Sequence, residues 1–230
     1  SLGIPAELLK SYADKLEAKG HTFAAYEKNT DAQVQIDRVQ DADVIMIANM
    51  PLKGEVIRAC KNLKFINVAF TGVDHVDLAA AKEMGVHTCL DTSGFLNTNY
   101  TDEMLEDIDL CLLDVKSGDE ETYHKVTGGT LQPTIDFGQR LAKAGKKIWV
   151  RFVLVPGLTD SEENVENVAK ICESFGDAVE HIDVLGFHQL GRPKWHELRI
   201  PYPLENQKGP NAATRERVTN QFKDHGFTVY

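Results

Sequence analysis

The chain of 230 residues is long enough for one large domain or two small ones. Its 42% hydrophobic and 26% charged residues are typical of a globular protein. The formal net charge of -10, with no basic cluster to offset it, argues against a nucleic-acid or anionic-membrane partner. No apolar run approaches the roughly 18 residues of a membrane span, and the amphipathic N-terminal pattern is not that of a signal peptide. Scattered cysteines predict free thiols in a reducing cytoplasm: Cys60, Cys89, Cys111 and Cys172.

Amphipathic helix patterns alternate along the chain with short runs rich in Val, Ile and Phe. The expected helices cover residues 5–19, 31–40, 52–60, 74–84, 101–107, 131–144, 162–175 and 211–225. The expected strands cover residues 22–27, 42–49, 64–70, 86–92, 110–116, 148–155 and 181–188. The apolar runs are nearly continuous, which predicts strands buried on both faces of a mainly parallel sheet in an α/β fold. A right-handed crossover through helix 74–84 would make strands 64–70 and 86–92 parallel neighbours.

The loop after the third expected strand opens the run "FTGVDHVDLAAAKEMGV". A glycine there lets the backbone approach a ligand closely, and amides at a helix start favour an anion. The loop residues Thr71, Gly72 and Val73 are therefore a candidate site for a small carboxylate. The alternative is that Gly72 only makes the turn and Asp74 caps the next helix.

That run and the segment before it resemble the outer, flavodoxin-like substrate domain of the D-2-hydroxyacid dehydrogenases, over residues 2–86. The resemblance implies that backbone N–H groups around Thr71, Gly72 and Val73 face a substrate carboxylate. The sequence contains no GxGxxG after a strand, so a dinucleotide fingerprint is missing. Hydride transfer is therefore not expected.

Polar residues mark the strands of the second half in the segments "LDTSG", "LLDVK", "RFVLVPG" and "GFHQLG". Carboxyl ends of parallel strands share one rim, where α/β proteins build their sites. We expect four of these residues to cluster there: Asp91, Asp114, Lys116 and His188. The alternatives are a turn cap for Asp91, a solvated pair for Asp114 and Lys116, and a structural role for His188. Arg151 is placed at the start of its strand.

The motifs "HTCLDTSGF", "LCLLDVK", "VRFVLVPGLTD" and "VLGFHQLGRPKW" resemble, over residues 86–230, the C-terminal half of pyruvate formate-lyase activating enzymes. These are radical S-adenosylmethionine enzymes on a partial β/α, TIM-like barrel. The resemblance implies a cofactor site made by Asp91, Thr92, Asp114, Lys116, Arg151 and His188. It also implies that the Asp pair can hold a monovalent cation, although we assign no metal ligand and no catalytic residue.

Radical S-adenosylmethionine enzymes need a CxxxCxxC triplet, because thiolates hold their iron–sulfur cluster. The sequence has no such triplet, so we expect no iron–sulfur cluster. Residues 1–86 and 87–230 are interpreted as two segments joined at a shared helix–Gly–strand corner, forming one continuous α/β domain. The favoured hypothesis is a chimera or fusion, engineered or natural, that lacks intact catalysis and keeps part of an S-adenosylmethionine site for a nucleoside ligand. The alternatives are an activating protein whose cluster-binding half is missing and a small-carboxylate binding module.

Overall fold

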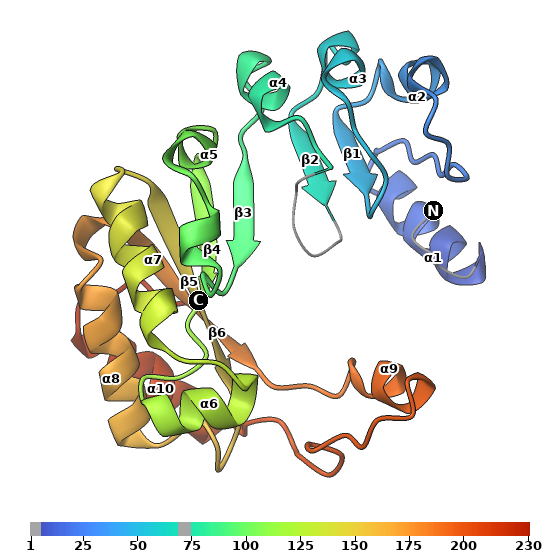
Figure 1. The fold of residues 1–230 in the computed structure, drawn as a ribbon. Helices are drawn as coiled ribbons and strands as arrows, with labels where there is room; N and C mark the ends of the chain where they lie inside the picture. The colour runs from blue at the N-terminus through green and yellow to red at the C-terminus, as the bar shows by residue number, and fades with distance from the viewer. Residues whose placement is uncertain (1–5, 69–74) are drawn as a thin grey trace. The chain divides into compact units, whose positions relative to one another are not determined.

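The computed structural model describes residues 6–68 and 75–230. The described chain is an α/β fold in which every strand pairing is parallel, which confirms the predicted fold class. It divides into two compact units, Ser1–Thr88 and Cys89–Tyr230 (Figure 1). The predicted division at residues 86 and 87 lies close to this boundary. That the two segments form one continuous domain stays a prediction.

The first unit buries one face of a two-stranded sheet under short helices. Its elements are α1 (Ala6–Glu17), α2 (Ala32–Val39), β1 (Val44–Ile47), α3 (Gly54–Ala59), β2 (Phe65–Val68) and α4 (Leu78–Glu83). Ile45 and Ile47 of β1 point into a core with Val56 and Ile57 of α3, while the alternate residue Met46 stays exposed. This alternation is expected for a strand covered on one side only.

Residues 22–27 form no strand, so that expectation is wrong. The segment has strand-forming residues but no paired backbone, and its Glu27 carbonyl accepts from Arg38 Nη1 at 2.9 Å. Helix α4 begins at Leu78 rather than at residue 74, and Asp77 caps it by accepting from the Ala80 N–H at 2.9 Å. The candidate carboxylate loop, Thr71, Gly72 and Val73, lies outside the described residues.

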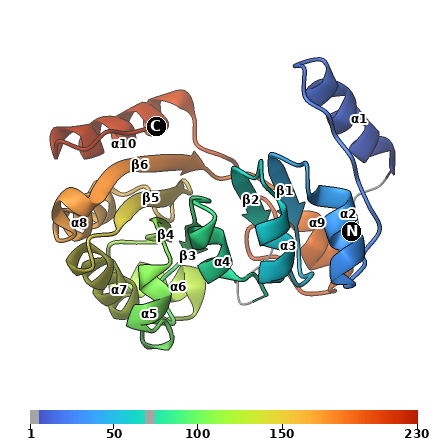
Figure 2. The ribbon, with the colours of Figure 1, turned by 90° about the horizontal axis from the view of Figure 1, so that it is seen from above.

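The second unit is a four-stranded parallel sheet in the order β3-β4-β5-β6. Its strands are β3 (Cys89–Thr92), β4 (Leu110–Asp114), β5 (Lys147–Leu154) and β6 (Val179–Gly186). Its helices are η1 (Asn97–Asn99), α5 (Asp102–Glu106), α6 (Glu120–Thr127), α7 (Gln132–Lys143), α8 (Glu162–Glu173), η2 (Gly176–Ala178), α9 (Arg192–Glu197) and α10 (Ala212–Asp224). Helices α7, α8 and α10 run along one side of the sheet (Figures 1 and 2). Strands in chain order with helices on one side are the arrangement of a partial β/α barrel.

The two faces of this sheet differ in burial. On the helix side of β5, Ile148, Val150, Phe152 and Leu154 are fully buried. The residues between them are only partly buried or exposed, and β6 alternates in a similar way. The expectation of burial on both faces is therefore wrong for these strands: helices cover one face, and the other carries the polar residues.

Strands β2 and β3 belong to different units, and the predicted pairing of residues 64–70 with residues 86–92 stays a prediction. β2 pairs with β1, and β3 pairs with β4 in a separate sheet.

The outer edge of β6 is covered by the segment after α10. Tyr230 N–H donates to Ile182 O at 3.0 Å, and the N–H groups of Ile182 and Val184 donate to Thr228 O and Tyr230 O, both at 2.9 Å. Val229 is thereby bridged in parallel to Ile182. In the described part of the chain, no helix has the length and apolar character required to span a membrane.

Candidate functional site

The polar face of the β3–β6 sheet is assembled by strand register. Asp114 pairs with Arg151, and Arg151 with Asp183, so these three side chains lie in one row on one face. Asp91 pairs with Leu112, two residues before Asp114, and so lies on the same face. The fully buried Leu113 and Val150 belong to the opposite, helix-covered face. Alternation alone thus brings residues from separate parts of the chain together.

Three of these side chains form a continuous set of ion pairs with Lys116, which follows β4. We call this set the charge network: Asp91, Arg151, Asp114 and Lys116. Arg151 Nε donates to Asp114 Oδ1 at 2.9 Å, and its Nη2 donates to Asp91 Oδ1. Lys116 Nζ donates to Asp114 Oδ2 at 2.7 Å. Because two carboxylates face two cations, the network is neutral as a whole. Arg suits this position because its planar guanidinium can bind two carboxylates at once.

The ends of the network are open and its centre is enclosed. The Asp114 and Arg151 side chains are 15% and 22% exposed, whereas Asp91 is 58% and Lys116 is 32% exposed. An ammonium group has three donors, of which Asp114 takes one. Lys116 can therefore donate to a ligand carboxylate, and Asp91 can accept from a ligand ammonium. The arrangement is suited to a zwitterion.

The other predicted site residues lie apart from the network. Thr92 is on the helix-covered face, where its Oγ1 accepts from the Gly94 N–H at 3.0 Å and lies 3.3 Å from Tyr100 Oη. Gly94 has a φ of +70°, so Thr92 shapes the turn that follows β3. His188 follows the carboxyl end of β6, is exposed, and accepts from the Leu190 N–H at 3.3 Å. His188 therefore lies at the carboxyl-end edge of the sheet, as Asp114 does, but its imidazole binds the backbone of the turn that follows β6.

Arg151 is the fifth residue of β5 rather than its first, so its predicted place at a strand start is wrong. That position sets it level with Asp114, whose carboxylate it binds. Sequence reasoning also missed Asp183 and His181, which lie on the same face and approach each other to 3.5 Å between Oδ1 and Nε2. Their spacing of two within "HIDVLG" placed them on one strand face, and that signal was available.

The four cysteines are largely shielded from solvent. Cys60, Cys111 and Cys172 are buried, and Cys89 is partly buried. Burial raises the pKa of Cys89 to about 11 and raises the pKa of the other three as well. Cys111 pairs with Leu90, so it lies on the opposite sheet face from Cys89. Among the described residues no three His, Cys, Asp or Glu side chains are placed to hold a metal ion.

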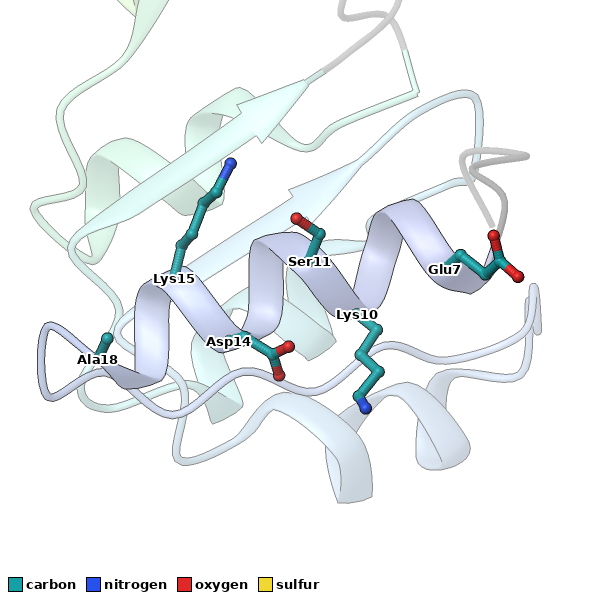
Figure 3. A pocket seen from close by; sticks show the side chains of 6 residues that line it. All are labelled: Glu7, Lys10, Ser11, Asp14, Lys15 and Ala18. Carbon is teal, nitrogen blue, oxygen red and sulfur yellow. The ribbon is translucent and has the colours of Figure 1, made fainter.

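A cavity of about 440 Å³ lies along α1 in the first unit. Its lining residues are Glu7, Lys10, Ser11, Asp14, Lys15 and Ala18. In Figure 3 these side chains diverge around one helix, with Lys15 and Lys10 pointing to opposite sides. Ligand sites need polar groups that converge, so we do not assign a site there.

Comparison with known proteins finds relatives of two kinds. Residues 5–105 match the model of the D-isomer specific 2-hydroxyacid dehydrogenase catalytic domain. The pyruvate formate-lyase 1-activating enzyme of Escherichia coli (strain K12) is 36% identical over 152 residues, which are 65% of this chain and 61% of that protein. The pyruvate formate-lyase-activating enzyme of Clostridium pasteurianum is 35% identical over 147 residues, 64% of this chain and 61% of that protein. The chain resembles two different enzyme families.

The dehydrogenase match runs past the predicted junction into β3 and α5. The chain spans about 61% of the length of the activating enzymes named above. The identity supports an activase-like relation between this chain and those enzymes.

Solved structures share the fold. A domain of pyruvate-formate lyase-activating enzyme from Bacteroides vulgatus ATCC 8482 has a TM-score of 0.53 at 18% identity, covering 66% of this chain and 85% of that one. Streptococcus suis SuiB, solved bound to S-adenosylmethionine, has a TM-score of 0.53 at 13% identity, covering 97% of this chain and 60% of that one. At these identities the likeness shows an α/β fold in common.

Proposed function

We propose that residues 89–230 form part of an activase-type S-adenosylmethionine site. The observation that carries the proposal is the charge network, which places an exposed carboxylate and an available ammonium on one polar sheet face. The relation to activating enzymes and the fold shared with a protein solved with S-adenosylmethionine support the same ligand class. Thr92 and His188 are proposed as outer members of the site on resemblance alone.

Within this proposal each residue has a distinct task. S-adenosylmethionine carries an amino-acid end with one ammonium and one carboxylate. Lys116 donates to the carboxylate and Asp91 accepts from the ammonium. Arg151 binds the Asp91 carboxylate, and Asp114 binds the Lys116 ammonium. Because Arg151 and Asp114 both lie in strands, they hold these two groups in place. The enclosed centre reduces screening by water.

We further propose that the chain as given does not carry out radical chemistry. The four cysteines do not fit an iron–sulfur cluster, because they are buried or partly buried and have raised pKa values, and Cys89 and Cys111 lie on opposite faces of the sheet. The four free thiols support operation in the reducing cytoplasm, and the net charge of -10 supports a partner that is not nucleic acid.

Isothermal titration calorimetry with S-adenosylmethionine tests the binding proposal. We expect a dissociation constant of roughly 0.1–1 mM, a free energy of about -4 to -5.5 kcal/mol. Lys116→Met should weaken binding at least about tenfold, because a charge-assisted hydrogen bond to the carboxylate is lost. Lys170→Met, which removes a surface lysine paired with Glu166, is the matched control and should bind like the wild type. Equal binding by both variants would refute the assigned site.

The proposal that the chain does not carry out radical chemistry is tested by anaerobic reconstitution with iron and sulfide, followed by reduction in the presence of S-adenosylmethionine. We expect no 5′-deoxyadenosine above the control without protein. Its formation would show that the cysteines do assemble a functional cluster.

A second candidate function is binding of a small carboxylate by Thr71, Gly72 and Val73. The match of residues 5–105 to the 2-hydroxyacid dehydrogenase domain favours it. Titration with a D-2-hydroxy acid, followed by backbone amide NMR shifts, provides the test. Shifts confined to residues 71–73 and their neighbours are the expected result, and unchanged amides there would exclude it.

A further inference from the structure

A buried amide joins two loops at the carboxyl ends of β4 and β5. Asn164 of α8 is 2% exposed. Its Oδ1 accepts from Ser117 Oγ and from the Gly118 N–H, both at 2.7 Å, and its Nδ2 donates to Thr159 O at 2.7 Å. We call Ser117, Gly118, Thr159 and Asn164 the Asn164 clasp. Both the acceptor and the donor of one side chain are thereby used between segments distant in sequence.

The Ser117–Gly118 end of the clasp fits tightly. Ser117 is fully buried. A Cβ on Gly118 would lie 2.4 Å from Val168 N and 2.6 Å from Asn164 O, distances that real Cβ atoms do not tolerate. Gly118 therefore lets the loop approach the backbone of α8 closely. This fixed turn begins one residue after Lys116, an end member of the charge network.

The Thr159 end fixes the loop that follows β5. Thr159 Oγ1 donates to Val153 O at 2.8 Å and accepts from the Val155 N–H at 2.9 Å. Thr159 is 2% exposed, so these bonds are shielded from water. Because β5 also carries Arg151, the clasp connects the loop next to Lys116 with the strand that bears the guanidinium.

We propose that Asn164 is a positioning residue for Lys116. It holds the Ser117–Gly118 turn against α8, so that the Lys116 ammonium stays on Asp114 at 2.7 Å and remains directed toward the open side of the network. Asn164 acts through the loop and does not touch a ligand. The inference rests on the proposed function for its effect on binding, while its effect on Lys116 can be measured without any ligand.

The physical basis is the conformational entropy of lysine. A Lys side chain has many rotamers, and an unfixed loop multiplies the positions that its ammonium can reach. When the backbone beside Lys116 is held, fewer states must be given up on binding. Loss of the clasp should weaken S-adenosylmethionine binding about fivefold, the equivalent of ordering one long side chain.

The test follows the side-chain ammonium of Lys116 by ¹⁵N NMR at low temperature, assigned by its loss in Lys116→Met. We expect a resolved signal in the wild type, since the pair with Asp114 slows exchange. Asn164→Ala should broaden or remove it. Asn164→Asp keeps an oxygen acceptor for Ser117 and Gly118 but loses the donor to Thr159 O, so it should restore the signal in part. Val218→Ala, a cavity variant in α10, controls for lost stability and should keep the signal.

An unchanged Lys116 signal in Asn164→Ala, or its loss in Val218→Ala to the same extent, would overturn the positioning role. Should Asn164→Ala fail to fold, Ser117→Ala removes one bond of the clasp and is expected to broaden the signal partially; no broadening there would also overturn the role. If the wild type shows the NMR behaviour but binds no S-adenosylmethionine, the proposed function fails and the positioning role stands. A fivefold weaker affinity in Asn164→Ala with partial rescue in Asn164→Asp supports both.

Discussion

Arg151 on β5 lies directly beside Asp114 on β4, and its Nε donates to Asp114 Oδ1 at 2.9 Å. The Arg151 side chain is 22% exposed and that of Asp114 is 15% exposed, so this pair is mostly shielded from water. Its two members come from strands separated by α6 and α7 in the chain. The Arg151–Asp114 ion pair therefore depends on the pairing of β4 with β5, and it forms the centre of the candidate site.

Replacement of Arg151 by Met should destabilise the protein by about 2–3 kcal/mol, because Asp114 and Asp91 lose a shared cation in a partly buried place. Urea unfolding measures the change. Arg192→Met is the control, since Arg192 pairs with Glu205 and their side chains are 46% and 40% exposed, and exposed pairs contribute about 1 kcal/mol or less. Equal losses in both variants would show that the Arg151 pair is no more than a surface contact.

The two faces of β5 should respond differently to the same truncation. Val150→Ala, on the helix-covered face, should cost about 2 kcal/mol, because Val150 is fully buried. Val153→Ala, on the polar face, should cost about half of that or less, since Val153 is only partly buried. Comparison of urea midpoints tests this. A larger loss in Val153→Ala would mean that the polar face is packed in solution.

The thiols should react in an order set by burial. Cys89 is the least buried of the four cysteines, but burial raises its pKa to about 11, so little thiolate is present at pH 8. We expect slow labelling by N-ethylmaleimide at Cys89 and slower labelling at the other three. Mass spectrometry of the labelled peptides measures the rates, with urea-unfolded protein as the reference. Rapid native labelling of Cys111 would contradict its placement under the helices.

His225 should make stability depend on pH. Its Nδ1 lies 2.7 Å from Glu173 Oε1 and its Nε2 lies 3.0 Å from Glu166 Oε2, and these hydrogen bonds raise the pKa of His225 above 6.5. A raised pKa in the folded state means that the contribution is full below about pH 6.5 and is lost as pH rises through the folded value. The same contact lowers the pKa of Glu166 below 4.5, so its contribution is present above about pH 4.5 and is lost on acidification.

The stabilising window of this contact therefore lies between about pH 4.5 and 6.5. Urea midpoints of the wild type and of His225→Gln should differ most near pH 6 and converge above pH 8. A constant difference across this range would mean that His225 stabilises the α8–α10 contact by packing alone.

The predicted cluster was correct where the local pattern carried the information. Asp114 and Lys116 lie at the end of an apolar run, and parallel strands bring such ends together, so their neighbourhood with Asp91 follows from the sequence. The alignment of Arg151 with Asp114 could not be predicted from the local pattern, because it depends on the register in which β5 pairs with β4. His188 is exposed, and its Nδ1 accepts from the Leu190 N–H, a contact that local periodicity does not predict.

The wrong expectations concern features that depend on tertiary contacts as well as on local sequence. Residues 22–27 have strand-forming side chains, yet a strand requires a second backbone edge with which to pair. On the polar face of β5, Lys147 and Arg151 are polar but Trp149 and Val153 are apolar, so "KIWVRFVL" lacks the regular alternation that predicts one-sided burial. Helices α6 and α9 were also missed, although Asp119 caps the first of them by accepting from the Thr122 N–H at 2.7 Å.

The segment that pairs with β6 also bears on how the protein behaves in solution. Thr228 O and Tyr230 O occupy donors of Ile182 and Val184 that would otherwise form an open sheet edge. A strand edge with free N–H groups is a template for another chain. Loss of the pairing made by residues 228–230 would therefore be expected to promote aggregation through β6 before it weakens the core.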